Sequence, residues 1–345
     1  MKRIAYVMAL AMALIGLISI GQTAAARASF SPQPGQLYQL TATGEIWAFV
    51  GPACSGQTCA GWIRLDHNPS TKAVVAAGFN LYQLHKDGRI WRFRGAACSG
   101  NSCPGWEMID DNPAAIAIAA SAWPREQLYQ LHQDGSIWKA DPVGVCQGDQ
   151  CPGWEMVDNN PTTVQIAATK TQLFQRHKNG GIWSFLGQPC AEGACHWAQL
   201  DNNPAAASIT AGKGQIYQLH SNGTIWGSTG KSCEKNACNG WLPYDNAPTA
   251  QLIVTEKGLY QRRANGQILY SKGGWCTLLG GCGGWVLLDG NPATVEIAVG
   301  AGTLYQRHSN GRIWRYTGTA CSQTSCPGWE MIGNSPVPAT ITAAQ

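Results

Sequence analysis

The sequence predicts an all-β fold, a seven-bladed β-propeller with four-stranded blades, and the first observation behind this prediction is a tandem repeat. An aromatic residue that follows Leu or Ile and precedes Gln returns every 43 to 47 residues. It stands at seven positions: Tyr38, Tyr82, Tyr129, Phe174, Tyr217, Tyr260 and Tyr305. A period of this length, with several short apolar runs and turn signals in each copy, is typical of one propeller blade per repeat.

The second observation is the pattern within one copy, which residues 81–120 illustrate. A β-rich run at 81–85 leads through a turn at Asp87-Gly88 to a second run at 89–94, which predicts a hairpin because Gly supplies the positive φ of a tight turn. Residues 105–110 and 115–120 predict two further strands, with Pro113 at the corner between them. The seven copies begin near residues 37, 81, 128, 173, 216, 259 and 304.

The third observation concerns the ends of the array. The 115–120 run and its equivalents are small and apolar, so they suit the crowded innermost position of a blade. The array starts at Leu37 with a second strand and ends at 339–344 with an inner strand. We therefore expect the C-terminal strand to complete the N-terminal blade formed by 37–66 and to close the ring, which hides the strand edges of an open array.

The 14 cysteines form one pair in every repeat, with none left over. The pairs are Cys54/Cys59, Cys98/Cys103, Cys146/Cys151, Cys190/Cys195, Cys233/Cys238, Cys276/Cys282 and Cys321/Cys326. An even count at regular spacing in an exported protein predicts disulfides, one per blade. A zinc site is a weaker interpretation, because each repeat offers two sulfurs instead of four and lacks the C-x2-C spacing.

Residues 1–28 predict a secretory signal peptide, with Lys2 and Arg3 before an apolar run and small residues at Ala24–Ala26 and Ala28. An uncleaved signal anchor is the alternative. We expect residues 29–345 to form a single secreted propeller domain with no membrane insertion after cleavage. The formal net charge is only +4. No cluster of Lys and Arg suggests a nucleic-acid partner.

Most of the 15 tryptophans recur twice per repeat, as Trp91 and Trp106 do, with Leu269 in place of the first one in the sixth copy. We expect this repeated set to fill the space between blades. Trp123 and Trp275 fall outside the pattern, in connections, which makes both of them candidates for exposed ligand recognition.

The motif Leu-Tyr-Gln-x-His-x-Asn/Asp-Gly-x-Ile-Trp, followed by a Gly-Trp strand and an Ile-Ala-Ala strand, resembles the repeat of tectonin and tachylectin-like β-propellers. The resemblance covers 37–345. It implies a lectin function, with multivalent binding of glycans on cell surfaces. The regular C-x4-C loop departs from the family pattern, so the resemblance supports the class of function and not individual sugar-contacting positions.

A histidine recurs at the end of the second strand, beside the hairpin turn, with Thr41 and Arg263 in the first and sixth copies. These candidate ligand-binding residues are His85, His132, His177, His220 and His308. One interpretation is a hydrogen-bonded network with the turn residue and the Asp that begins each Asp-x-Asn-Pro corner, such as Asp110. The other is a shallow pocket between blades in which these groups bind sugar hydroxyls beside a tryptophan.

We expect no enzyme activity, no cofactor and no metal site. Catalytic motifs such as H-E-x-x-H and G-x-S-x-G are absent from the sequence, and near-identical repeats do not bring different groups to one point. The Asp-Asn-Asn-Pro corner lacks the spacing of a calcium loop, and an Asx turn explains it more simply. Two alternatives to a lectin stay open: an extracellular protein-interaction scaffold, or a propeller enzyme in which His67, Arg125, Glu126 and His196 converge.

Overall fold

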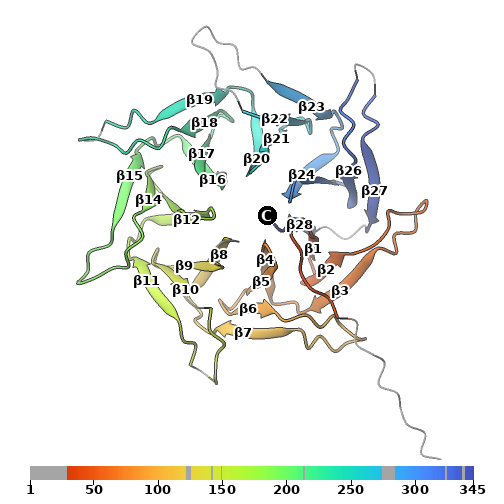
Figure 1. The fold of residues 1–345 in the computed structure, drawn as a ribbon, viewed down its shortest axis with the longest axis horizontal. Coiled ribbons are helices and arrows are strands. Elements are labelled where there is room, and N and C mark those ends of the chain that lie inside the picture. Colours follow the sequence, from red (N-terminus) through yellow and green to blue (C-terminus); the bar gives the residue numbers. More distant parts are fainter. Residues whose placement is uncertain are drawn as a thin grey trace, which may run out of the picture.

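The computed structural model describes residues 29–345 except 122–125, 141–142, 149, 213, 236, 274–283, 323–324 and 336–338. Within this part of the chain, 28 strands form seven four-stranded antiparallel sheets and there is no helix. The sheets are arranged around a central axis as the blades of a propeller (Figure 1). The predicted signal peptide lies outside the described residues, and no described helix has the length and apolar character needed to span a membrane.

In every blade the first strand named is the innermost and the fourth is the outermost. Blade 1 comprises β28 (Ala339–Ala343), β1 (Leu37–Thr41), β2 (Glu45–Phe49) and β3 (Trp62–His67). Blade 2 comprises β4 (Thr71–Ala77), β5 (Asn80–His85), β6 (Ile90–Phe93) and β7 (Trp106–Asp110). Blade 3 comprises β8 (Ala115–Ser121), β9 (Gln127–His132), β10 (Ile137–Ala140) and β11 (Trp154–Asp158).

The remaining four blades repeat this order. Blade 4 comprises β12 (Thr163–Ala168), β13 (Leu173–His177), β14 (Ile182–Phe185) and β15 (Trp197–Asp201). Blade 5 comprises β16 (Ala206–Gly212), β17 (Gln215–His220), β18 (Ile225–Ser228) and β19 (Trp241–Asp245). Blade 6 comprises β20 (Thr249–Thr255), β21 (Gly258–Arg263), β22 (Ile268–Ser271) and β23 (Trp285–Asp289). Blade 7 comprises β24 (Thr294–Gly300), β25 (Thr303–His308), β26 (Arg312–Tyr316) and β27 (Trp329–Asn334).

The predicted closure is confirmed. The C-terminal strand β28 pairs antiparallel with β1, with Leu37 opposite Ala343 and Thr41 opposite Ala339. The chain therefore ends near the centre of the ring (Figure 1). Backbone bonds from Gly35 N to Ala344 O and from Ala344 N to Gln36 O extend this contact. Closure leaves no blade with an unpaired inner strand, which is how propellers avoid exposed edges.

The hydrophobic core lies between the blades, as the repeat predicts. Seven clusters of buried side chains each combine residues from neighbouring blades; one contains Tyr82 and Leu84 of blade 2 with Leu128 of blade 3. The small residues of the inner strands let seven strands approach the axis, while aromatic side chains fill the wider space farther out.

Six disulfides of the predicted pattern are present, each within one loop: Cys54–Cys59, Cys98–Cys103, Cys146–Cys151, Cys190–Cys195, Cys233–Cys238 and Cys321–Cys326. The seventh pair, Cys276 and Cys282, lies outside the described residues. Disulfides at this density indicate an oxidising environment.

Candidate functional site

The candidate site lies between neighbouring blades, at the end of the ring where each outer strand turns the corner into the next inner strand. Between blades 3 and 4 it forms a cavity of about 360 Å³. Asp158, Asn159 and Asn160 of the blade 3 corner line one side. Gln175, His177, Trp183 and Trp197 of blade 4 line the other.

Two β-bulges set this geometry. One lies between Thr163 and Gln165, where β12 pairs with the end of β13, and it places Thr163 opposite His177. The other lies between Ile182 and Trp183, where β14 pairs with β15. Bulges of this kind change the direction in which a side chain points. Both recur in blade 5, so the arrangement belongs to the repeat.

All five candidate histidines are buried and pack against the tryptophan of the adjacent strand. His177 and Trp183 have ring centroids 5.7 Å apart and planes inclined by 25°. The other pairs, at 5.6 to 5.8 Å, are His85–Trp91, His132–Trp138, His220–Trp226 and His308–Trp314. Burial lowers the pKa of His177 and of the other four, so these imidazoles are neutral at neutral pH.

The expected polar network exists, but its members differ from those predicted. Thr163 Oγ1 donates to Gln175 Oε1 at 2.5 Å, and Gln218 Nε2 donates to Asp201 Oδ2 of the preceding blade at 2.9 Å. The histidine Nε2 has no hydrogen-bond partner among the described residues in His85, His132, His177 and His220. Only His308 Nε2 lies near an acceptor, Gln306 Oε1 at 3.2 Å. Thr, Gln and Asp therefore carry the network, and the histidine contributes mainly ring packing.

The buried glutamine of the Leu-Tyr-Gln motif is the residue that sequence reasoning missed. Gln175 is 1% exposed, and the equivalent glutamine is buried in all seven blades. Its recurrence in every copy was a signal, because a buried amide requires partners.

The corner aspartates are also buried, which disfavours their charged form. Burial raises the pKa of Asp110 to about 6, although the hydrogen bond from Gln130 acts to lower this pKa. Burial likewise raises the pKa of Asp158, Asp201 and Asp245. Several polar atoms at these positions lack a partner in the described part of the chain: Asp110 Oδ2, Asp289 Oδ2, Gln130 Oε1, Gln218 Oε1, Trp91 Nε1 and Trp314 Nε1.

Two blade-to-blade gaps depart from this pattern. In blade 6, Arg263 replaces the histidine and lies 3.9 Å from Asp245, while Leu269 replaces the tryptophan. In blade 1, Thr41 and Trp47 face the blade 7 corner, where Gly333 replaces the aspartate. Five gaps thus carry the full set of Asp, His and Trp.

The second tryptophan of each repeat has a structural role. Trp197 Nε1 donates to Val157 O of blade 3 at 2.8 Å. The same bond to the preceding blade is made by Trp62, Trp106, Trp154, Trp241 and Trp329. The disulfide loop adds a backbone bond at the same edge, as from Cys190 N to Met156 O at 3.1 Å.

The described residues among the other predicted candidates, His67, Glu126 and His196, are not part of this cavity. Trp123, Trp275 and Arg125 lie outside the described residues. His67 ends β3, Glu126 precedes β9 and His196 precedes β15, so these three lie in different blades. The described residues include two groups of possible metal ligands, His67 with Cys98 and Cys103, and Asp110 and Asp111 with Cys151. Their sulfurs are in disulfides, so neither group supplies a thiolate.

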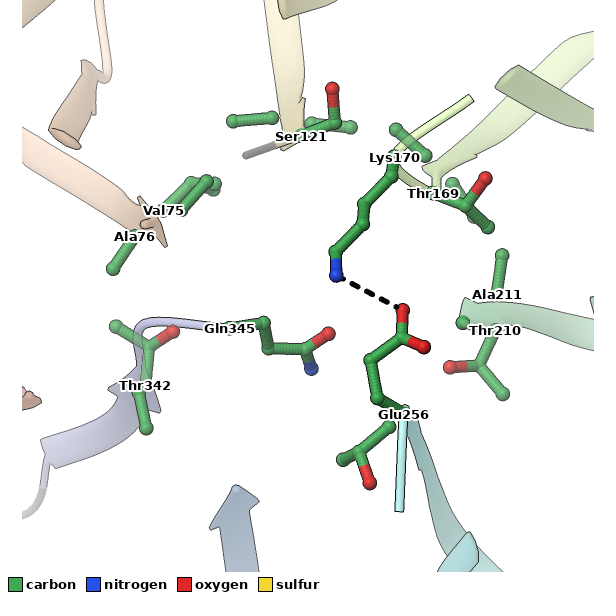
Figure 2. Close-up of a pocket in the computed structure, with 18 of the residues that line it drawn as sticks. Val75, Ala76, Ser121, Thr169, Lys170, Thr210, Ala211, Glu256, Thr342 and Gln345 are labelled. Atoms are coloured by element: carbon green, nitrogen blue, oxygen red, sulfur yellow. Dashed lines mark ion pairs between the residues drawn. The ribbon is translucent and has the colours of Figure 1, made fainter. Parts of the chain in front are cut away.

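The central channel holds a further cavity of about 480 Å³ at the opposite end of the ring. Alanine and threonine side chains of the inner strands form most of its wall (Figure 2). Across its mouth, Lys170 Nζ lies 3.4 Å from Glu256 in an ion pair (Figure 2). Both side chains are more than half exposed, so this pair is screened by solvent.

Comparison with known proteins identifies no family: no protein-family model and no curated protein matches the sequence. Solved structures do match. Apo AztD from Citrobacter koseri aligns with a TM-score of 0.52 and 10% identity, over 91% of this chain and 98% of that one. YCF48 bound to the D1 peptide aligns at 0.51 and 12%, over 84% and 92%. Yeast RCC1 (Prp20), bound to Kap60, aligns at 0.51 and 13%, over 91% and 86%. At such low identity these likenesses show the β-propeller fold alone.

Proposed function

We propose that this protein is a secreted, non-catalytic, multivalent lectin of tectonin or tachylectin-like type, and that its sugar sites are the five gaps between blades that carry Asp, His and Trp, of which the gap between blades 3 and 4 forms the cavity described above. The observation that carries the proposal is the recurrence of one cavity chemistry around a rigid ring. The export signal predicted at 1–28 and the disulfides agree with an extracellular location.

The chemistry of the cavity suits a sugar. Trp183 is only partly buried, and an indole packs well against the apolar face of a pyranose ring. Asp158 and Asn159 offer oxygens and amide hydrogens for hydroxyl groups. Buried polar atoms without a protein partner, such as His177 Nε2, require water or a ligand to complete their hydrogen bonding.

The arrangement suits weak binding at many sites. Several equivalent sites on one ring can engage a surface that displays many copies of a glycan, which raises the overall affinity about 10²- to 10⁴-fold above one site.

The test is a glycan array probed with the oxidised protein, followed by tryptophan replacement. Leu269 occupies the tryptophan position in blade 6 without loss of the blade, so leucine is the matched replacement. Successive exchange of Trp91, Trp138, Trp183, Trp226 and Trp314 for Leu should lower binding to dense glycan spots stepwise. The lectin proposal fails if the array is blank or if the fivefold variant binds as the original does.

A protein-interaction scaffold is the second candidate. Two of the structures that share the fold were solved with a partner, YCF48 with the D1 peptide and yeast RCC1 with Kap60. A blank array together with a partner that binds one asymmetric face of the ring would favour this function.

A further inference from the structure

A second polar cavity, of about 350 Å³, lies between blades 4 and 5. Gln172, Ser184, Gln215 and Ser228 supply polar groups to it, and Phe174 and Leu200 form part of its floor. It lies at the end of the ring where inner and second strands are joined, because Gln172 directly precedes β13 and Gln215 begins β17. The His–Trp gaps lie at the other end.

Blade 4 lacks, beside this cavity, an ion pair that blades 2 and 7 have at the equivalent positions. In blade 2, Arg92 of β6 and Glu107 of β7 stand at the corresponding register positions and form an ion pair at 2.6 Å. Blade 7 has the same pair, Arg315 and Glu330, also at 2.6 Å. The equivalent residues of blade 4 are Ser184 and Ala198, which are paired across β14 and β15.

Blade 1 also lacks the ion pair, and a segment from outside the blade fills its gap. Ala48 and Ile63 occupy the two positions. Phe30 packs there with its ring centroid 6.4 Å from Tyr38 and 5.9 Å from Phe93, and its N–H donates to Gly95 O at 2.8 Å. A gap without the pair therefore accepts an added group.

Blade 3 carries Lys139 and Glu155 at the two pair positions, and tyrosines fill the gaps that follow blades 5 and 6. Tyr244 packs 5.6 Å from Tyr217 between blades 5 and 6, and Tyr270 packs 4.8 Å from Tyr260 on the face toward blade 7. Between blades 4 and 5 the described residues supply no such group, and Phe174 is the one copy without the tyrosine hydroxyl.

The lining selects for an uncharged polar ligand. Ser184 Oγ accepts from Gln172 Nε2 at 3.2 Å, and Ser228 Oγ accepts from Gly230 N at 3.0 Å, so both hydroxyls keep their hydrogen for donation. Gln215 Oε1 accepts from the Tyr217 hydroxyl at 2.9 Å, which leaves the amide hydrogens of Gln215 for a ligand. None of the described residues that line the cavity is charged, so their side chains would not compensate an ionic ligand for its lost hydration.

Ser228 also distinguishes this gap from that of blade 1, where the equivalent residue is Phe93. An aromatic side chain such as Phe30 would leave the polar groups of the lining unpaired. We propose that the cavity between blades 4 and 5 is a separate binding site for one neutral, polyhydroxylated ring, such as a pyranose. The site does not depend on the His–Trp gaps.

The test is methyl and indole NMR of the oxidised protein with free glucose, galactose, mannose, N-acetylglucosamine and N-acetylgalactosamine. We expect at least one sugar to shift the methyl signals of Leu200 and Ile216. The double variant S184R/A198E restores the pair of blades 2 and 7 and should abolish these shifts, or weaken the affinity at least about tenfold, roughly 1.4 kcal/mol. Its fold is checked by the unchanged indole signal of Trp183.

Two results would overturn the proposal: no methyl shift with any sugar up to about 50 mM, well above a Kd of 1 mM, or equal shifts in the filled variant. A stronger response to the capped peptide Ser-Phe-Ser-Pro, which copies residues 29–32, would assign the cavity to a peptide instead. The lectin proposal is judged separately, from the indole signals of the five His–Trp gaps.

Discussion

The indole Nε1–H of Trp197 on β15 donates to the carbonyl oxygen of Val157 on β11 at 2.8 Å, which ties the outer edge of blade 4 to that of blade 3. Outer strands are where propeller blades diverge most, so a bond at this point resists separation of the blades. The sequence predicts the repeated Gly-Trp tryptophan as a packing residue. The structure adds a hydrogen bond from its indole N–H, which hydrophobic patterning does not predict.

Replacement of Trp197 by Phe keeps an aromatic ring and removes the donor. The carbonyl of Val157 loses its partner, so we expect the free energy of unfolding to fall by about 1 to 3 kcal/mol. Urea denaturation followed by circular dichroism measures the change. Trp285 is the matched control, because its Nε1 is buried without a hydrogen-bond partner among the described residues. Equal losses for W197F and W285F would show that the bond contributes nothing beyond packing.

The hairpin glycine beside each histidine is required for two reasons. Gly180 has φ +84°, and a Cβ there would overlap the carbonyl oxygen of Asn203 in the corner loop. We expect G180A to lower the free energy of unfolding by more than about 2 kcal/mol, since strain and overlap add. Gly187 has φ +87° and open space around it, so G187A isolates the strain and should cost about 1 kcal/mol. If both variants lose the same stability, the contact with the corner has no energetic weight.

The sequence was sufficient for the strand order and for the six described disulfides, because these follow from properties of a single repeat: a tight Asn-Gly or Asp-Gly turn, a small apolar inner run and one cysteine pair. The closure followed from the two ends of the array. The polar network was not predictable in the same way. Gln218 bonds to Asp201 across a blade boundary, so one repeat read alone assigns the corner aspartate to the wrong partner. The cavity between blades 4 and 5 had a sequence signal, since Glu107, Glu155 and Glu330 recur in only three copies. This recurrence indicates a cavity only once it is known that Ser184 and Ala198 lie on the same face of blade 4 as Phe174.

The five buried histidines make stability depend on pH. Burial lowers the pKa values of these histidines in the folded protein. In the unfolded chain a histidine has its ordinary pKa of about 6.5, so at a pH below about 6.5 the unfolded chain binds more protons than the folded protein. The stabilisation associated with neutral imidazoles is complete above pH 6.5 and is lost as the pH falls from there through the folded pKa values. Asp110 acts in the opposite direction. Because burial raises its pKa to about 6, the folded state takes up this proton first and gains stability as the pH falls from 6 towards 4.

NMR titration of the histidine Cε1–H signals checks this prediction. We expect five signals with midpoints below 6.5 in the folded protein, and midpoints near 6.5 for the same signals in concentrated urea. Midpoints at or above 6.5 in the folded state would mean that a hydrogen bond to the charged imidazole outweighs burial.

The disulfide loops also form backbone hydrogen bonds to the neighbouring blade. Cys98 N donates to Arg64 O of blade 1 at 3.0 Å while the Cys98–Cys103 bridge closes the loop. The double variant C98A/C103A should lose about 2 kcal/mol in the loop-entropy description. It should also expose the Cys98 amide to hydrogen exchange, because the loop no longer holds that N–H against β3.

Intact mass before and after reduction tests the whole disulfide pattern: seven bridges predict a gain of fourteen hydrogens from the 14 cysteines. Free thiols in the purified protein would contradict the seven bridges, and unchanged exchange at Cys98 in the variant would contradict the role of the loop in holding that N–H.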